Sequence, residues 1–338
     1  MRRQQRWTGP SGRYPGRSSG LVTGALLGVP DSGDRRPGGG RGFGRLTLRH
    51  ADPGTHAHGL VVGGAHVRHP RHGRAAEVLV GRRRSAPKLV LAYIDIGEAE
   101  DWRWYWAWSQ EWPLGEPKPD DWPAYILTHD PDGWEGNYPV AYWDPEWKDI
   151  IIYGLHQSSA PYGDYASVID EVLRSGFDGI YLDWVEAFEN EEVRAAADAA
   201  GLDPAEEMIG FIGEMRAYAR QRDPDFLIVQ QNAAALIDGH PELLDAIDAI
   251  AQEAIWFDGE ATDDWDDPQG HDSINEQDLV SYYTEYLDQY LGVGVPVFDC
   301  EYAVENAAEA YSRSADRGYV PYATRRSLAR LTTTPPPG

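Results

Sequence analysis

The sequence predicts an α/β fold and, within that class, a (β/α)8 TIM barrel. From residue 88 onward, short apolar, β-branched runs alternate with segments whose apolar residues recur at helical spacing, the pattern of parallel strands joined by helices. Nearly every apolar run ends in a polar or acidic residue, and a barrel builds its active site at such strand ends. A doubly wound sheet would gather its polar ends at one switch point, and the sequence has no glycine-rich phosphate loop.

Seven strands are predicted, because seven runs are apolar and closed by glycine or a polar residue, as expected for strands buried on both faces. They cover residues 88–97, 138–144, 176–183, 226–232, 246–253, 295–302 and 318–324. The strand ends carry acids and an amide: Asp95, Asp144, Asp183, Asn232, Glu253 and Glu301. The eighth strand of a barrel would precede Leu89. We expect this first strand to be missing or garbled, which leaves the two flanking strands with unpaired edges.

Three helices are predicted between these strands, at residues 165–176, 203–222 and 275–292. The second begins with Asp203 as N-cap and Pro204 at the first helical position. The other two end in glycine, which favours a helix C-terminus.

The start of the chain differs in composition from the rest. Residues 1–88 hold 16 Arg and 1 Lys against 4 acids, whereas the remaining residues hold 13 basic and 51 acidic side chains, a net charge of −38. The basic segment is either a disordered tail, a nucleic-acid-binding arm, or a misassigned start or reading frame, and the last agrees best with the missing strand. The expected organisation is a leader at 1–87, a barrel at 88–330 and a disordered tail at 331–338.

Targeting signals are weak. The one early apolar run, residues 21–29, is too short to span a bilayer, is interrupted by two glycines and makes a poor signal peptide. The few aromatic residues of the leader form no regular interleaving with the basic ones, so we expect no nucleic-acid partner. The single cysteine, Cys300, excludes an intramolecular disulfide.

The residue types after position 88 favour carboxylate chemistry. Four His and one Cys follow that position without a metal-binding spacing such as HExxH, which argues against a zinc site. A Ser-His-acid triad lacks its GxSxG elbow. Two carboxyl groups suffice to break a glycosidic bond, because one protonates the leaving oxygen and the other acts as nucleophile or base.

Asp183 and Glu253 fit this chemistry. Alternation along a strand places Asp183 on the same face as Gly179 and Tyr181. It places Glu253 on the same face as two alanines. Such small residues behind a terminal acid leave room for a substrate above it. A strand-end Glu with few bases nearby is expected to have a raised pKa, as a general acid requires. Two other roles stay open: Asp183 as cap of the next helix, and Glu253 as partner of a nearby base.

Six short motifs follow one another in order: "LAYIDIGEAEDWRWYW", "YPVAYWDPEWKDII", "GFDGIYLDWVEAF", "IVQQN", "AIAQEAIWF" and "VFDCEYA". With them the chain resembles the endo-α-1,4-polygalactosaminidase family, glycoside hydrolase family 114, over residues 88–326. The resemblance implies a (β/α)8 barrel that cleaves α-1,4-linked galactosamine or N-acetylgalactosamine polymers, and an extracellular location. In that family a first strand precedes "AYIDIGEAE", and residues 1–88 contain nothing like it.

The resemblance also implies the catalytic roles, because the family has an acid at the positions of both Asp183 and Glu253. We expect a retaining mechanism with Asp183 as nucleophile and Glu253 as acid/base, and no metal or other cofactor.

A shell of sugar ligands is expected around this pair. Arg103 binds either a sugar hydroxyl or a neighbouring carboxylate, and Asp144 either faces the site or caps the helix that starts at Pro145. Glu301 is preferred over Asp299, because it lies nearer the end of its strand. The expected substrate-binding residues are Tyr93, Asp95, Glu98, Arg103, Trp104, Tyr142, Asp144, Tyr181, Gln231, Asn232, Glu301 and Tyr322.

Nine of the thirteen tryptophans lie between Trp102 and Trp147, five of them in "DWRWYWAWSQEW" after a strand end. Flat rings stack on pyranoses and attract an ammonium group, so two or three are expected to face sugar. The alternative is a compact core inside the loop, which some of the rings must form.

The sequence thus predicts a hydrolase for an α-galactosaminan, acting as a monomer on a polysaccharide or oligosaccharide. Two alternatives remain: a carbohydrate-binding barrel without turnover, and a glycosidase for another amino sugar or a uronic polymer. The acidic surface is typical of adaptation to high salt, and it would also attract a polycation.

Overall fold

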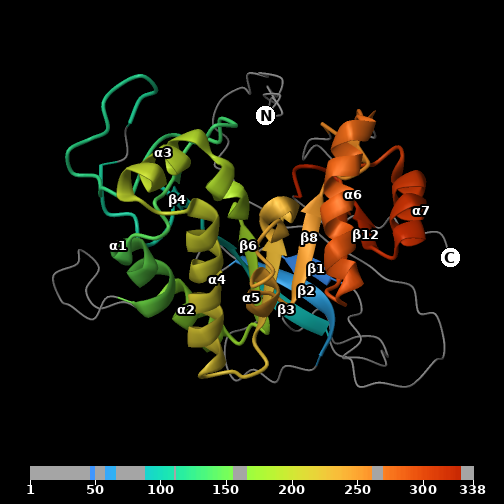
Figure 1. Ribbon diagram of the computed structural model, residues 1–338, viewed down its shortest axis with the longest axis horizontal. Coiled ribbons are helices and arrows are strands. Elements are labelled where there is room, and N and C mark those ends of the chain that lie inside the picture. The colour runs from blue at the N-terminus through green and yellow to red at the C-terminus, as the bar shows by residue number, and fades with distance from the viewer. Residues whose placement is uncertain are drawn as a thin grey trace.

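The computed structural model describes residues 46–49, 58–65, 88–109, 112–154, 166–260 and 269–328. At its centre lies one eight-stranded sheet in the order β1-β2-β3-β6-β7-β8-β11-β12 (Figure 1). All neighbours from β3 to β12 pair in parallel, which confirms the predicted α/β fold class. The strands are β1 (Leu46–Arg49), β2 (His58–Ala65), β3 (Lys88–Asp95), β6 (Gly179–Asp183), β7 (Leu227–Gln231), β8 (Ala249–Glu253), β11 (Val297–Glu301) and β12 (Val320–Ala323).

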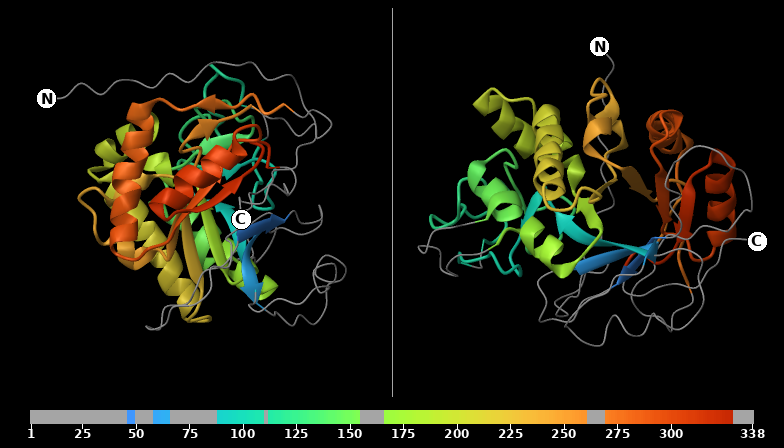
Figure 2. Two further views of the ribbon diagram at one scale, coloured as in Figure 1. Left: turned by 90° about the vertical axis from the view of Figure 1, so that its right-hand side faces the viewer. Right: turned by 90° about the horizontal axis from the view of Figure 1, so that it is seen from below.

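An antiparallel hairpin occupies the edge where the parallel first strand of a barrel would lie. β2 pairs antiparallel with β3 and β1 antiparallel with β2, and Figure 2 shows the hairpin beside β3. The prediction that the β3 edge is unpaired is therefore wrong. Within the described part of the chain, no pairing joins β12 to β1. The remainder of the leader and the tail at 331–338 lie outside the described residues, so the disorder predicted for them stays a prediction.

The prediction of a sheet strand at residues 138–144 is also wrong. Only β5 (Asn137–Pro139) is extended, and it pairs antiparallel with β4 (Glu98–Glu100) in a separate two-stranded sheet, so that β3 pairs directly with β6. The following residues are buried, but the chain turns at Asp144 and enters α1 (Pro145–Lys148). An apolar run indicates that its residues are buried but not that they pair with another strand. Here side-chain packing beneath the loop buries the residues without a strand partner.

The three predicted helices are confirmed as α2 (Val168–Ser175), α4 (Pro204–Arg220) and α6 (Gln277–Gly292). Asp203 caps α4 by accepting hydrogen bonds from the N–H groups of Ala205 and Glu206, as predicted. Gly176 ends α2 in the left-handed region at φ 77°. Shorter elements complete the description: η2 (Asp149–Tyr153), η3 (Val185–Glu189), α3 (Glu191–Ala200), η4 (Ala234–Ile237), α5 (Leu243–Ala246), β9 (Phe257–Asp258), β10 (Ser273–Ile274) and α7 (Ala307–Arg317).

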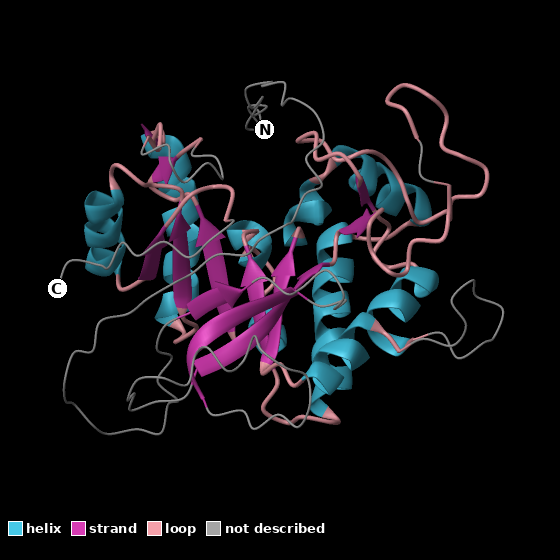
Figure 3. Cartoon of the chain, turned by 180° about the vertical axis from the view of Figure 1, so that it is seen from behind, coloured by secondary structure: helices cyan, strands magenta, loops and turns pink. Residues whose placement is uncertain are grey.

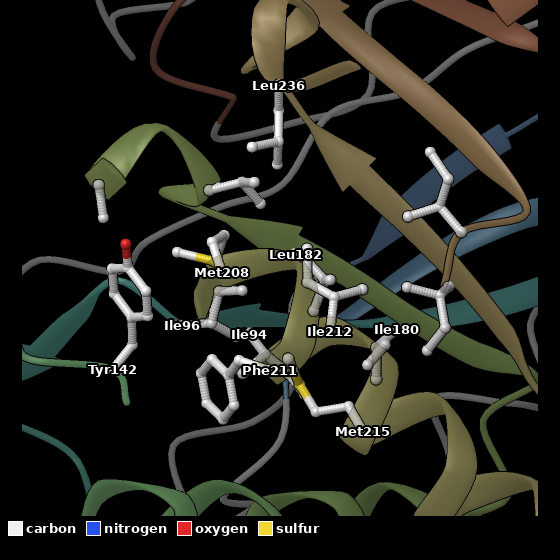
Figure 4. Close-up of a cluster of buried hydrophobic side chains, with 14 of the residues drawn as sticks. Ile94, Ile96, Tyr142, Ile180, Leu182, Met208, Phe211, Ile212, Met215 and Leu236 are labelled. Carbon is white, nitrogen blue, oxygen red and sulfur yellow. The ribbon is translucent and has the colours of Figure 1, made fainter. Parts of the chain in front are cut away.

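Helices cover one face of the sheet, and Figure 3 shows the strands in front of them when the molecule is seen from behind. The main core fills this helical side, where α4 packs on β3 and β6. Figure 4 shows its side chains, among them Ile94, Ile180, Leu182, Met208, Phe211, Ile212 and Met215. None of the described helices has the length and apolar character needed to cross a membrane.

A second core fills the other face of the parallel strands. It contains Leu91, Tyr181, Val229, Ala249, Ala251, Phe298, Cys300, Tyr302 and Tyr322. Because side chains alternate along a strand, Ile180 and Leu182 face the helices while Tyr181 and Asp183 face this inner core, as predicted. Gly179 lets β6 and β7 approach closely, since a Cβ there would lie 2.3 Å from the Leu227 carbonyl oxygen.

Candidate active site

The predicted catalytic acids meet at one edge of the sheet. Asp183 ends β6, Glu253 ends β8, and Gln231 ends β7 between them. The carboxyl ends of parallel strands lie at the same edge, so these side chains share one environment. The negative charge of Asp183 raises the pKa of Glu253, which places the two carboxyl groups within electrostatic reach of each other.

Glu253 is held by phenol and amide donors. The Tyr302 hydroxyl donates to Oε2 at 2.6 Å, and the Tyr181 hydroxyl donates to Oε1 at 3.3 Å. Burial and then the charge of Asp183 raise the pKa of Glu253 to about 7, although hydrogen bonds from Tyr302, Gln231 and Tyr181 act in the opposite direction. No ion pair of Glu253 occurs within the described part of the chain, so the alternative of a structural salt bridge is not supported. A carboxyl group that titrates near neutrality suits proton transfer in both directions.

Asp183 has a different environment. The Tyr93 hydroxyl donates to Oδ2, and the backbone N–H of Trp184 donates to Oδ1 at 2.8 Å. Burial, and to a smaller extent the charge of Glu100, raises the pKa of Asp183 above its ordinary value, although these two hydrogen bonds and the positive charge of Arg103 oppose the rise. No side-chain hydrogen bond caps η3, so Asp183 is not a helix cap. Both oxygens are oriented by donors that stabilise the ionised form, as a nucleophile requires.

Several predicted ligands gather beside Asp183. Arg103 forms an ion pair with Glu100 through Nε, so the salt-bridge alternative holds for this residue. Its charge still acts on Asp183. A cavity of about 30 Å³ between β3, the loop after β4 and α2 is lined by residues that include Tyr93, Asp95, Arg103 and Trp104, but Asp183 and Glu253 do not line it.

Two of the predicted ligands, Asp95 and Glu98, accept hydrogen bonds from other parts of the chain. Asp95 accepts hydrogen bonds from the N–H groups of Gly97 and Glu98 at 3.1 and 2.9 Å, which fixes the turn after β3. Glu98 is buried and accepts a hydrogen bond from the Asn137 side chain at 2.9 Å. Burial and the charge of Asp130 raise the pKa of Glu98 to about 10. Both acids therefore have structural partners within the chain.

Three residues that were predicted to bind the sugar are used within the protein instead. Tyr142 is fully buried and donates to the Pro204 carbonyl oxygen at 2.6 Å. Asp144 caps α1 by accepting from the Glu146 N–H, the helix-cap alternative. Glu301 is 0% exposed and accepts three backbone N–H bonds from the loop after Glu253. We therefore do not retain these three as sugar ligands.

Strained backbone follows each of the three strands at the site. Trp184, Asn232, Ala233 and Ala254 have φ of 54°, 51°, 54° and 50° and directly follow β6, β7 and β8. Residues other than glycine occupy this region at a cost, and such positions cluster at functional sites. A Cβ on Gly97 would lie 2.3 Å from the Trp184 carbonyl oxygen, so only glycine fits against this turn.

Glu186 is a third acid that strand-end reasoning missed, because it lies in η3 rather than on a strand. Its Oε1 accepts a hydrogen bond from the Asn232 side chain at 3.2 Å, and the Asn232 Oδ1 accepts from the Glu253 N–H at 3.0 Å. Burial and the charge of Asp183 raise the pKa of Glu186 to about 8. Its spacing of three residues from Asp183 was the available signal. Tyr302 was also missed, although it directly follows Glu301.

Most of the clustered tryptophans form the loop core rather than a sugar surface. Trp106 and Trp112 stack on Tyr138, and Trp122 meets all three rings edge-on. Trp147 is fully buried. Within the described part of the loop, Trp102 and Trp134 are exposed, by 46% and 65%.

Sequence comparison assigns the family. The profile of glycoside-hydrolase family GH114 matches residues 74–336. The chain belongs to this family. It is 31% identical over 264 residues to an uncharacterized protein of Deinococcus radiodurans, covering 78% of this chain and 71% of that protein. It is 32% identical over 279 residues to an uncharacterized protein of Methanocaldococcus jannaschii, covering 78% and 69%.

Two solved structures resemble this GH114 glycosidase at low identity. The glycoside hydrolase domain of PelA from Pseudomonas aeruginosa gives a TM-score of 0.48 at 17% identity, covering 71% of this chain and 79% of that one. Aspergillus fumigatus Ega3 in complex with galactosamine gives a TM-score of 0.45 at 16% identity, covering 70% and 75%. Within its described residues, the GH114 chain has no cluster of three His, Cys, Asp or Glu side chains that could hold a metal ion.

Replacing Tyr302 by Phe is expected to raise the pKa of Glu253 further. The Tyr302 hydroxyl stabilises the carboxylate, so its removal favours the protonated form and moves the titration from near 7 to higher pH, by about one unit. A ¹³C titration of the Glu253 carboxyl carbon measures this shift. Tyr319→Phe is the matched control, because that hydroxyl donates to Asp288 at 2.9 Å, on α6. An unchanged or lowered Glu253 pKa in Tyr302→Phe would refute the assigned hydrogen bond.

Proposed function

We propose that this GH114 glycosidase hydrolyses α-1,4-linked galactosamine or N-acetylgalactosamine polymers by a retaining mechanism. The observation that carries the proposal is the pair of differently held carboxyl groups at the ends of β6 and β8. Burial raises the pKa of both groups. At Asp183 two hydrogen bonds and the charge of Arg103 oppose the rise, whereas at Glu253 the charge of Asp183 adds to the effect of burial and the pKa reaches about 7. Retaining glycosidases divide the roles of nucleophile and acid/base between two such groups.

In the first step, the Glu253 carboxyl group gives its proton to the glycosidic oxygen as the carboxylate of Asp183 attacks the anomeric carbon. The leaving sugar departs with that proton, and a glycosyl ester with Asp183 remains. In the second step, the Glu253 carboxylate takes a proton from a water molecule, whose oxygen attacks the same carbon and releases Asp183. Both groups return to their starting states, and no cofactor is consumed.

The acidic surroundings of the pair favour an amino sugar. Glu186 lies close enough for the charges of Asp183 and Glu253 to raise its pKa, and Glu100 acts on Asp183 in the same way. Arg103 is already paired with Glu100. An ammonium group on the substrate would relieve the repulsion among these acids, whereas the carboxylates of a uronic polymer would add to it.

Release of new reducing ends tests the function. The full-length protein would be incubated with de-N-acetylated galactosaminan, its N-acetylated form, a glucosamine polymer and polygalacturonate. We expect reducing ends from the galactosaminans alone. Binding without release would identify a carbohydrate-binding barrel instead. Release from polygalacturonate or the glucosamine polymer would assign another substrate.

We further propose that the enzyme acts as a monomer outside the cell, where such polymers occur.

The acidic composition is proposed to be an adaptation to high salt. Residues after position 88 carry a net charge of −38, and Lys occurs three times in the whole chain. Like charges repel over about 10 Å at 0.1 M salt but over about 3 Å at 1 M. Thermal unfolding in about 2 M KCl is therefore expected several degrees above that in about 0.1 M KCl. A melting temperature that stays constant or falls in high salt would exclude this explanation.

A further inference from the structure

Trp102 and Trp134 differ from the other clustered tryptophans, because their rings reach solvent. The two residues flank the β4–β5 pair: Trp102 follows β4, and Trp134 precedes β5. Trp102 lies against Gly136, where a Cβ would come within 2.8 Å of the ring, and the Asp101 N–H donates to the Gly136 carbonyl oxygen at 2.9 Å. The backbone of Trp134 is held as well, since its N–H donates to Asp130 Oδ1 at 2.8 Å.

The backbone beside both rings is tied to the β4–β5 pair. Tyr138 of β5 belongs to the loop core, with Trp106 and Trp112 stacked on it. The Trp134 carbonyl oxygen accepts the Asn137 N–H at 3.2 Å, which ties this turn to β5. Exposed apolar rings that are held in place cost little conformational entropy when they bind a ligand.

The charge around the rings is negative. Asp101 and Glu135 each adjoin one of the two tryptophans in sequence. Burial is the main cause of the raised pKa of Tyr138 in the loop core, and the charges of these two acids add to it. Asp132 and Glu135 are exposed. Aromatic faces bordered by carboxylates attract cations that also carry apolar surface, which describes a protonated amino sugar.

The segment that carries Trp102 begins close to the proposed catalytic edge of the sheet. β4 follows β3 directly, and the charge of Glu100 at the end of β4 acts on Asp183. Arg103, which follows Trp102, acts on Asp183 as well. A polymer that extends beyond Asp183 and Glu253 toward Glu100 and Arg103 reaches the β4–β5 pair.

We propose that Trp102 and Trp134 form a separate binding surface for the polycationic polysaccharide chain, outside the cleavage site. This inference rests on the proposed function for the identity of the polymer. The surface would hold long chains near the catalytic pair and make no contact with short substrates that fill only the cleavage site.

Binding to de-N-acetylated galactosaminan tests the surface directly. An Asp183→Asn protein, which would not degrade the polymer, is compared with the same protein carrying Trp102→Ala, Trp134→Ala or both. We expect the double variant to lose about ten- to hundredfold in affinity for long chains, because each ring–ammonium contact contributes about 0.5–2 kcal/mol. Leu114→Ala, at an 87% exposed apolar side chain, is the control and should bind as its parent.

A second measurement separates this surface from the cleavage site. With Asp183 intact, the double variant should lose a similar factor in kcat/KM on long chains and keep the parent rate on a trisaccharide. Unchanged polymer binding, or an equal loss on the trisaccharide, would overturn the inference. Cleavage with no effect of the tryptophans refutes this surface but not the proposed function. Tryptophan-dependent binding without any cleavage by the parent refutes the function but not the surface.

Discussion

Replacing Asp183 by Asn is expected to lower kcat on galactosaminan by about 10⁴-fold while polymer binding is largely kept. The amide carries no charge, so it cannot attack the anomeric carbon. Its shape matches the carboxylate, and the Trp184 N–H can still donate to the remaining oxygen, so the strand end should keep its structure. Reducing-end release under saturating substrate measures the loss.

Asp144→Asn is the matched control for this variant. Asp144 caps α1 by accepting the Glu146 N–H at 2.8 Å, and Asn caps helices as well as Asp does. Its activity and stability should therefore equal those of the parent protein. Near-normal turnover by Asp183→Asn would remove Asp183 from the mechanism.

Replacing Glu301 by Ala is expected to destabilise the fold by about 3–6 kcal/mol. The N–H groups of Ile255, Trp256 and Phe257 donate to the two Glu301 oxygens at 2.6, 2.9 and 2.9 Å, and Glu301 is fully buried. Each buried donor left without an acceptor costs about 1–3 kcal/mol. The loss is large for a single substitution, because proteins are stable by about 5–15 kcal/mol in total.

Urea unfolding of the Glu301→Ala protein measures this effect. Glu309→Ala is the control: Glu309 pairs with Arg313 on the exposed side of α7, and an exposed pair contributes about 0–1 kcal/mol. A free energy of unfolding for Glu301→Ala within about 1 kcal/mol of the parent would contradict the anchoring role. The same variant also tests whether the loop after Glu253 depends on this anchor.

The placement of Asp183 and Glu253 on one face and at one edge could be predicted because two rules act together. Parallel strands present their carboxyl ends at one edge, and alternation decides which side chains face inward, so Asp183 and Glu253 had to share a face and an edge. The inner face of alanines behind Glu253 followed from the same alternation. These rules depend on the backbone alone and need no knowledge of side-chain partners.

The partners themselves could not be predicted in this way. The position of Glu301 at a strand end indicates that it lies near the site. That position does not indicate that three N–H groups of the preceding loop donate hydrogen bonds to its carboxylate oxygens. Glu186 lay beyond the same reasoning, since it reaches Asn232 from a 3-10 helix. Apolar runs indicate burial but not pairing, which is why residues 138–144 were assigned to the sheet.

The edge before β3 illustrates a further limit. A parallel first strand needs an apolar run of its own, and the one such run noted in the leader, residues 21–29, lies outside the described residues. β2 instead supplies backbone partners to β3 in the antiparallel direction. Backbone hydrogen bonds place few demands on side-chain type, so a strand edge can be paired by a segment whose composition does not predict a buried strand.

The stereochemistry of the first product tests the central claim most directly. Proton NMR would follow the anomeric signals of de-N-acetylated galactosaminan during the first minutes of digestion by the full-length enzyme. A covalent intermediate on Asp183, resolved by water with Glu253 as base, predicts that new reducing ends appear first as the α anomer. New ends that appear first as the β anomer would contradict the assigned roles, and the absence of new ends would contradict hydrolysis of this polymer.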